Sequence, residues 1–270
     1  MKTIINNGII GRGIGIFSKW TDVLYTNGFH VQHYKKSYRI VNKYNQVFFN
    51  GNKIDTFKKI EKIRKYKNKK ENIMLIHGYA NAYTIMSPMK KYLSSYENRY
   101  NIFDVRYAST YLSLEQIVKD LSLVVKYTEE PINIIAHSLG GLIAMELKKL
   151  YPEKIRKIIL IASPINGSKT AKYFNKLKPE KVSGPIIKDL IKGVTPYPCE
   201  LYIINCFTKG INKSALFRED NDGVVSISET LPPLIKYQLF TLKNSHTAIM
   251  KDKKMFHIIK EIFQLSKLKS

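Results

Sequence analysis

The sequence predicts an α/β fold in which a mostly parallel sheet carries helices on both of its faces. From residue 72 onward, short apolar segments rich in β-branched residues alternate with longer segments of helical periodicity. One apolar segment passes directly into a serine and then into a helical pattern, which is the order of a strand, a sharp turn and a helix. At 270 residues, of which 44% are apolar, the chain can form one large domain of this class or two small ones.

The elements are expected in a regular order along the chain. Strands are predicted at residues 73–76, 100–105, 131–136, 155–161, 201–207 and 237–242. Helices are predicted at residues 87–96, 112–127, 139–151 and 248–265, because apolar residues recur there three or four positions apart. Residues 166–198 contain short amphipathic pieces and no clear strand, and we expect them to form a small cap.

The N-terminal region follows a different pattern. Residues 38–54 are predicted to form a hairpin, because two strand-like runs flank a turn at residues 42–45. Upstream, the pattern fits a helix over residues 17–24 and a strand at residues 29–31. We therefore expect an N-terminal extension, residues 1–36, that either docks on the domain or touches a membrane, and an α/β domain over residues 37–270.

The chain is strongly basic, with 45 Lys and Arg against 21 Asp and Glu, a net charge of +24. The lysines are spread along the whole chain and accompany many Asn, Ile and Tyr residues, which indicates compositional bias rather than a nucleic-acid site. No nucleic-acid partner is expected, whereas contact with an anionic membrane surface is a consequence that this charge allows. With no long uncharged apolar stretch and no signal-peptide pattern, we expect a cytoplasmic protein, with peripheral membrane contact as the alternative. The oligomeric state is not readable from the sequence.

The two cysteines, Cys199 and Cys206, flank the strand predicted at residues 201–207. Seven steps along a strand span about 23 Å, whereas a disulfide needs Cα atoms within about 7 Å. We therefore expect both thiols to be unpaired, which fits a reducing compartment.

Ser138 stands where a strand passes into a helix. Such a turn is tight, and the residues beside the serine are small: Ala136 precedes it by two positions and Gly140 follows it by two. In this arrangement the Ser138 hydroxyl projects from the carboxyl edge of the sheet. The backbone N–H of Leu139, in the first helical turn, has no intrahelical partner and can face an oxyanion. The alternative is an ordinary strand–helix turn that happens to carry a serine.

Two further strand ends carry polar residues, Asp222 after the strand at 201–207 and His246 after the strand at 237–242. Because functional groups of parallel sheets gather beyond the carboxyl ends of the strands, we expect Ser138, Asp222 and His246 to meet. An imidazole can take the proton of a weakly nucleophilic hydroxyl, and a carboxylate on its other nitrogen fixes its tautomer. Gly223 lets the loop bend tightly beside Asp222, and Asp220 is the alternative acid.

A second oxyanion donor is expected in the turn His77-Gly78-Tyr79, which ends the strand at 73–76, with the backbone N–H of Tyr79 as the candidate. No His, Cys and Asp cluster has the spacing of metal ligands, and no glycine-rich phosphate loop is present. We therefore expect neither a metal nor another cofactor.

These segments resemble the α/β-hydrolase fold of the lipase and esterase type. The matching stretches are Leu75–Tyr79, Ala136–Gly141, Ile161–Ser168, Asn221–Ser226 and Ser245–Thr247. The stretch from Ala162 to Ser168 is similar to the T-P-x-x-G-S segment of bacterial lipases and of GPI-inositol-deacylase-like enzymes. Ala136 and Ser163 depart from the commonest pattern without removing a chemical group.

The resemblance spans about residues 37–270 and implies hydrolysis of a carboxylic ester, of a lipid or a small acyl compound, through an acyl-enzyme on Ser138 and without a cofactor. Two alternatives stay open. The same residues suit an acyltransferase, in which an alcohol other than water accepts the acyl group. A catalytically inactive, basic lipid-binding module is the other. In the segment 166–198, apolar faces either pack on the sheet or line an acyl pocket, with the interleaved lysines meeting an anionic surface.

Overall fold

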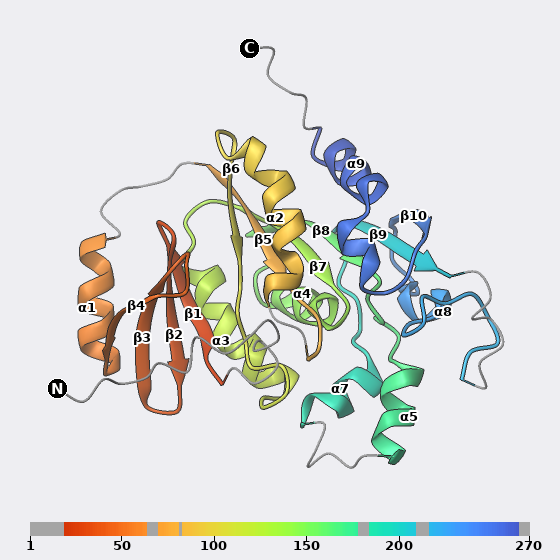
Figure 1. Ribbon diagram of the computed structural model, residues 1–270, viewed down its shortest axis with the longest axis horizontal. Coiled ribbons are helices and arrows are strands. Elements are labelled where there is room, and N and C mark those ends of the chain that lie inside the picture. Colours follow the sequence, from red (N-terminus) through yellow and green to blue (C-terminus); the bar gives the residue numbers. More distant parts are fainter. Residues whose placement is uncertain (1–18, 64–69, 81–82, 178–183, 209–215, 265–270) are drawn as a thin grey trace.

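The computed structural model describes residues 19–63, 70–80, 83–177, 184–208 and 216–264, which form two sheets and their covering helices (Figure 1). The N-terminal sheet is antiparallel and contains β1 (Thr21–Thr26), β2 (Phe29–Tyr34), β3 (Ser37–Asn42) and β4 (Val47–Gly51) in that order. The central sheet is parallel, in the order β10-β9-β8-β7-β5-β6. The predicted α/β class is therefore confirmed.

The strands of the central sheet are β5 (Glu71–Ile76), β6 (Tyr100–Asp104), β7 (Ile132–His137), β8 (Ile155–Ile161), β9 (Glu200–Phe207) and β10 (Gln238–Lys243). The connecting α-helices are α1 (Lys53–Ile63), α2 (Ser87–Leu93), α3 (Leu114–Tyr127), α4 (Leu139–Leu150), α5 (Lys169–Leu177), α7 (Ile186–Lys192), α8 (Ile227–Thr230) and α9 (Lys253–Ile262). Short 3-10 turns are η2 (Tyr83–Met86), η3 (Ser94–Tyr96) and η4 (Ala248–Lys251). None of the described helices is long and apolar enough to cross a lipid bilayer.

The central sheet is buried on both faces, as a parallel sheet requires. Met74 and Ile76 of β5 point into an apolar cluster that α3, α4, α5 and α7 cover. Ile73 and Leu75 alternate with them and point into the opposite cluster, which α2, η4 and α9 cover. Side chains of successive strand residues therefore divide between two cores, and the polar loops at the strand ends stay at the edges.

The N-terminal sheet corrects the helix predicted near its start. The helix expected over residues 17–24 is wrong, because residues 21–26 form β1, while residues 17 and 18 lie outside the described part. Asn27 and Gly28 join β1 to β2 with φ angles of 48° and 81°, the backbone of a two-residue hairpin turn. The boundary expected between residues 36 and 37 falls in the turn between β2 and β3, which pair throughout their length. Residues 21–51 are thus one sheet.

This sheet attaches to the open edge of the central sheet. The backbone N–H of Asp22 donates to the carbonyl of Arg106 over 2.8 Å, and Asp22 Oδ2 accepts the Arg106 N–H over 2.9 Å. On one face, β1 packs against α3, and α1 covers β3 and β4 (Figure 1). Tyr25 of β1 stacks on Phe103 of β6 with a centroid distance of 4.3 Å. The N-terminal strands are therefore held against the edge of the central sheet by hydrogen bonds and ring stacking.

The segment expected as a cap forms α5 and α7, with residues 178–183 outside the described part. Ile186, Ile187 and Leu190 of α7 are buried in the core cluster, so this helix packs on the sheet side. The outer residues of α5 differ, since Tyr173, Phe174 and Leu177 are 49–60% exposed. The two short helices therefore have different roles, and only α5 presents an apolar face outward.

Both cysteines are unpaired, as expected from the intact strand between them. The helix predicted over residues 248–265 is interrupted at Asp252, whose carboxylate accepts the N–H of Lys254 over 2.7 Å and begins α9. A residue of this kind is favoured at a helix start because its side chain satisfies a free N–H. Residues 265–270 lie outside the described part.

Candidate active site

Ser138 occupies a strained turn between β7 and α4. Its φ of 55° and ψ of −125° are rare for a residue with a side chain and are typical of a functional turn. The backbone N–H of Ser138 donates to the carbonyl of Ile161 over 2.9 Å, which fixes the turn to β8. Ser138 is 8% exposed, so its hydroxyl lies in a nearly closed surrounding.

Two glycines make this turn possible. A Cβ added to Gly140 would lie 2.5 Å from the carbonyl oxygen of Ile76 and 2.7 Å from that of His77. A Cβ added to Gly141 would collide with the side chain of Ser163. The first turn of α4 therefore lies directly against the end of β5 and the loop after β8, and any larger side chain would push the serine away.

His246 lies between Ser138 and Asp222. Its Nδ1 is 2.7 Å from Asp222 Oδ2, and its Nε2 is 3.0 Å from Ser138 Oγ. Because a carboxylate only accepts, Nδ1 carries the ring proton and Nε2 offers its lone pair to the serine hydroxyl. His246 is 7% exposed and Asp222 is 2% exposed, so the pairs are largely shielded from water.

The loop before α8 holds Asp222 rigidly. Asp222 Oδ1 accepts the backbone N–H groups of Val224 and Val225 over 2.9 and 2.7 Å. Gly223, with a φ of 95°, supplies the backbone conformation that this narrow turn requires. The backbone N–H of His246 donates to the Asp222 carbonyl over 3.1 Å, which ties the two loops together.

Asp222 is the ionised acid of this arrangement. Burial alone would raise the pKa of the Asp222 carboxyl, but the hydrogen bond and charge of His246, with the two backbone N–H groups, lower it overall. Asp220, the alternative acid, is exposed, and its carbonyl accepts the N–H of Ile227. The geometry therefore favours Asp222 as the candidate acid.

Cys206 contacts the candidate acid, and the sequence alone predicts no role for it. The Cys206 sulfur, at the end of β9, lies 3.4 Å from Asp222 Oδ2. Burial and the Asp222 charge raise the pKa of this thiol far above its usual range, so it stays protonated and can donate. The only sequence signal for it is its place near the end of the strand that precedes the acid loop.

His137 supports the loop of His246. Its Nε2 is 2.8 Å from the His246 carbonyl, so Nε2 donates, and the two rings lie 4.8 Å apart. Burial, with repulsion from His246, lowers the pKa of His137 to about 3. A neutral His137 therefore holds the backbone of His246 at ordinary pH.

The expected oxyanion donors come from two segments that the structure brings together. The close approach of Gly140 to Ile76 and His77 places the first turn of α4, including Leu139, beside the chain that leads to Tyr79. The loop is braced there, because the Tyr107 hydroxyl donates to the His77 carbonyl and the Ala80 N–H donates to Ser109 Oγ. Tyr79 itself is half-buried. The first turn of α4 and the end of β5 thus lie side by side near Ser138.

Helix α5 is joined to the acid loop. Thr170 Oγ1 donates to the Val224 carbonyl over 2.5 Å, and Lys169 Nζ lies 2.6 Å from Glu219 Oε1. Because Val224 also donates to Asp222, one hydrogen bond on each side of Val224 links α5 to the candidate acid. The start of α5, which leads into the exposed apolar face, is therefore attached to the loop of the candidate acid.

Among the residues that the structure describes, no group of three or more His, Cys, Asp or Glu side chains is arranged to hold a metal ion. The site is thus built from Ser138, His246 and Asp222, which lie on three loops after β7, β10 and β9. An acceptor for the serine proton and a buried carboxylate for the resulting imidazolium are both within hydrogen-bond distance. This arrangement can activate the serine hydroxyl as a nucleophile.

Parts of this chain are similar to a known protein family and to a curated enzyme. The family model described as serine aminopeptidase, S33, matches residues 67–195, a range that includes Ser138 and ends before Asp222. Homoserine O-acetyltransferase of Thermus thermophilus, in two strains, is 35% identical over 49 residues. That match spans 18% of this chain and only 13% of the relative's length.

Solved structures share the fold over most of the chain at low identity. A lipase of Bacillus licheniformis, BlEst2 in its mature form, is 15% identical with a TM-score of 0.56, covering 73% of this chain and 93% of that one. The metagenomic carboxyl esterase MGS0156 is 16% identical with a TM-score of 0.56, over 73% and 76%. The mouse alpha/beta hydrolase domain-containing protein 10 is 14% identical with a TM-score of 0.52, over 92% and 97%.

Proposed function

We propose that this chain, whose fold is shared with solved lipase and esterase structures, is a serine hydrolase that cleaves a carboxylic ester through an acyl-enzyme on Ser138. The observation that carries the proposal is the chain of hydrogen bonds from Ser138 Oγ through the His246 ring to Asp222 Oδ2. The strained backbone of Ser138 supports the same assignment, and the two glycines after it allow the close packing that holds this turn in place.

In the proposed reaction, His246 Nε2 accepts the hydroxyl proton while Ser138 Oγ attacks the carbonyl carbon of the ester. The carbonyl oxygen gains the negative charge and faces the backbone N–H groups of Leu139 and Tyr79. The tetrahedral intermediate collapses when His246 gives the proton to the leaving alcohol, and the acyl group stays on Ser138. A water molecule, activated by His246 in the same way, then releases the acid and restores the serine.

Asp222 has a defined part in this cycle. Its carboxylate keeps the Nδ1–H tautomer of His246 and stabilises the imidazolium that forms in each half-reaction. The lowered pKa of Asp222 keeps the carboxylate ionised throughout, although it is buried. Hydrogen bonds from Val224 and Val225 hold the carboxylate in place, so little reorganisation is needed when the charge develops.

The substrate class follows from the surface around α5. Tyr173, Phe174 and Leu177 form an exposed apolar face, and Lys172 and Lys176 lie exposed between them. A helix with this composition suits the boundary between apolar chains and anionic head groups. We therefore favour an ester with an apolar acyl chain, presented at a lipid surface of negative charge.

An acyltransferase is the second candidate, because the short match to homoserine O-acetyltransferase comes from an enzyme named for moving an acetyl group. The same acyl-enzyme would form, and an alcohol instead of water would remove the acyl group. An inactive lipid-binding module, the third alternative, has no specific observation in its favour.

The deciding experiment is product analysis with a series of p-nitrophenyl esters from acetyl to dodecanoyl, with and without a primary alcohol in excess. A hydrolase releases free carboxylic acid in both conditions, and this is the expected result. Transfer of most of the acyl group to the alcohol would identify an acyltransferase. Release of no p-nitrophenol from any ester would contradict the proposal and leave the binding module.

A further inference from the structure

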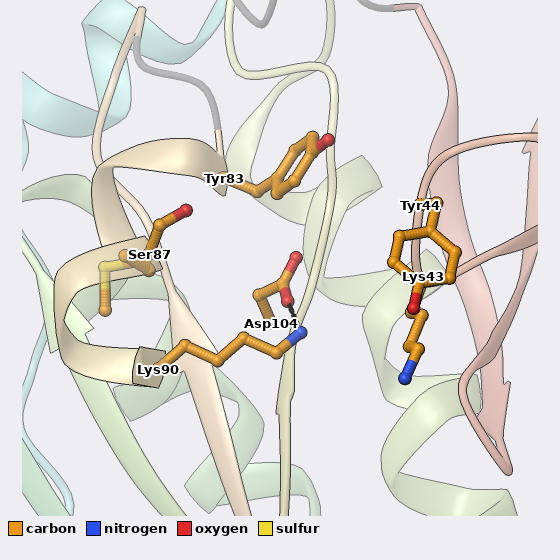
Figure 2. A pocket seen from close by; sticks show the side chains of 7 residues that line it. Lys43, Tyr44, Tyr83, Ser87, Lys90 and Asp104 are labelled. Carbon is orange, nitrogen blue, oxygen red and sulfur yellow. Dashed lines mark hydrogen bonds and ion pairs between the residues drawn. The ribbon is translucent and has the colours of Figure 1, made fainter. Parts of the chain in front are cut away.

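A separate recess lies at the joint between the N-terminal sheet and the central sheet (Figure 2). Its volume is about 310 Å³, at the lower end of the range of small-molecule sites. Its lining consists of Lys43, Tyr44, Tyr83, Met86, Ser87, Lys90 and Asp104. None of the three candidate catalytic residues belongs to this set, so the recess has no part in the chemistry proposed above.

Asp104, the last residue of β6, is the buried polar group of the recess. It is 3% exposed, and its Oδ1 accepts a hydrogen bond from the Lys90 ammonium. Its Oδ2 accepts no hydrogen bond from any residue that the structure describes. Figure 2 shows this second oxygen turned away from Lys90 and towards Tyr83. A buried carboxylate oxygen without a hydrogen-bond donor lowers the stability of the fold. We therefore expect a bound group to supply a donor at this point.

Arg106 leaves a matching donor unused. Its Nε lies 3.7 Å from Asp104 Oδ2, which is too far for a hydrogen bond, and has no other partner among the described residues. Burial would raise the pKa of Asp104, but Lys90, His30 and Arg106 together lower it, so Asp104 stays ionised. A hydroxyl group has the matching chemistry, because it can donate to Oδ2 and accept from a nearby N–H.

The walls of the recess are already in place. Arg106 Nη1 donates to Asn45 Oδ1 over 2.6 Å, and the guanidinium lies over the ring of Tyr83 at 4.3 Å. Arg106 thus ties the turn between β3 and β4 to the start of η2. Within that turn, Asn42 Oδ1 accepts the N–H groups of Tyr44 and Gln46. A ligand would therefore meet a preformed site and would not have to order it.

The charge of the recess favours an anion. Lys43 and Lys90 contribute two positive charges to the lining, while Asp104 contributes one negative charge, and the buried Arg106 lies behind Asp104. Lys43 is exposed, lies 5.2 Å from the ring of Tyr44, and forms no ion pair within the described part of the chain. Its ammonium is therefore available to an anionic group. Met86 and the rings of Tyr44 and Tyr83 offer apolar surface to the carbon skeleton of a bound ligand.

We propose that this recess binds a small polyol phosphate, with one hydroxyl donating to Asp104 Oδ2 and the phosphate beside Lys43. Both recognition elements are needed, because a bare anion leaves the carboxylate oxygen unsatisfied and a neutral polyol leaves Lys43 unused. Binding at this site does not depend on the proposed function, and the Ser138→Ala variant is expected to bind the same ligand with unchanged affinity.

The test is calorimetric titration of the full-length protein with three probes: glycerol 3-phosphate, inorganic phosphate and glycerol. We expect saturable binding of glycerol 3-phosphate, at least about tenfold tighter than binding of either of the other two. Lys43→Met should weaken it about tenfold. Lys36→Met, which removes the same charge from an exposed residue in the neighbouring turn of the same sheet, should leave it unchanged.

A second variant examines the carboxylate. Asp104→Asn should abolish the preference for glycerol 3-phosphate over inorganic phosphate, and its melting temperature shows whether the fold survives. If that variant unfolds, the comparison of Lys43→Met with Lys36→Met decides. The proposal is overturned if no probe saturates, if phosphate alone binds as tightly as glycerol 3-phosphate, or if the two lysine variants behave alike.

Discussion

The sulfur of Cys206 lies 3.4 Å from Oδ2 of Asp222, the same carboxylate oxygen that accepts the hydrogen bond of His246. A hydrogen bond from a second donor partly neutralises the negative charge on this oxygen. Less of that charge is then available to stabilise the imidazolium that forms when His246 accepts the serine proton. The thiol is therefore placed to set the strength of the proposed base from the far side of the carboxylate.

Two substitutions of Cys206, to alanine and to serine, should shift the pH profile of activity in opposite directions. In Cys206→Ala the carboxylate loses a donor, so the imidazolium becomes more favourable and the acid limb of kcat/KM shifts to higher pH. In Cys206→Ser a hydroxyl, which is a stronger donor than a thiol, should shift it to lower pH. The measurement is kcat/KM on a short ester from pH 5 to 9. Two profiles that coincide with the wild type would make Cys206 a packing residue only.

The choice of acid can be tested by two matched substitutions. Asp222→Asn should lower kcat by up to about 10⁴, because an amide can no longer hold the productive tautomer of His246. Asp220→Asn changes an exposed residue of the same loop and should lower kcat less than about threefold. Steady-state kinetics on one ester measures both. A larger loss in the Asp220 variant would transfer the acid role to that residue.

The parts of the fold that the sequence predicted share one property, a regular hydrophobic period. From residue 72 onward the alternation of strands and helices indicates the central sheet. Topology then places Ser138, Asp222 and His246 at the carboxyl edge before any contact is known. Residues 17–24 fit a helix because Trp20 and Leu24 are four positions apart, although residues 21–26 form the strand β1. The Asn27–Gly28 pair that follows is a strong hairpin signal and favours two paired strands.

Other features depend on contacts between distant residues. The sulfur of Cys206 and the carboxylate of Asp222 are 16 positions apart, and only the course of the loop between them brings them together. The recess at Asp104 requires the turn at Lys43 to reach the end of β6, a contact that the Arg106–Asn45 hydrogen bond secures. Neither hydrophobic periodicity nor a short motif marks such pairs, so the sequence alone does not indicate them.

Buried histidines should make the protein less stable in mild acid. Burial lowers the pKa of His137 to about 3 and that of His77 to about 4, against 6.5 for a free imidazole. Below pH 6.5 the unfolded chain binds protons that the folded chain does not, so stability is full above pH 6.5 and falls as the pH drops towards 3–4. Each histidine contributes at most about 1.4 kcal/mol per pH unit to this fall.

Urea denaturation at pH 7.0 and 5.0 measures the effect. The free energy of unfolding of the wild type should be lower at pH 5.0, and His137→Gln should reduce this difference. His257→Gln, at an exposed position of α9, is the control and should leave the difference unchanged. Equal pH dependence in the His137 and His257 variants would show that His137 does not titrate as its burial requires.

The exposed face of α5 gives a prediction about substrate presentation. If Phe174 and Leu177 meet the acyl chain, replacing both by serine should reduce activity on dodecanoyl esters in anionic vesicles several-fold and leave acetyl esters unaffected. The stimulation by anionic vesicles should fade between 0.1 and 1 M salt, because the Debye length shrinks from about 10 Å to about 3 Å.

Leu150→Ser is the matched control for α5, since Leu150 is 56% exposed at the opposite end of α4 from Ser138. This variant should respond to vesicles as the wild type does. Wild-type rates that are equal on acetyl and dodecanoyl esters, with no response to anionic vesicles, would leave a small-ester hydrolase whose surface lysines reflect composition alone.

The central claim is that Ser138 is the nucleophile, and labelling with a fluorophosphonate probe tests it most directly. The probe reacts covalently with an activated serine, so the wild type and the Ser122→Ala control should be labelled, since the Ser122 hydroxyl is bonded to the Lys119 carbonyl on the surface of α3. Ser138→Ala should show no labelling while keeping the wild-type melting temperature within a few degrees. Labelling of a folded Ser138→Ala variant at the wild-type rate would place the nucleophile elsewhere and contradict the account.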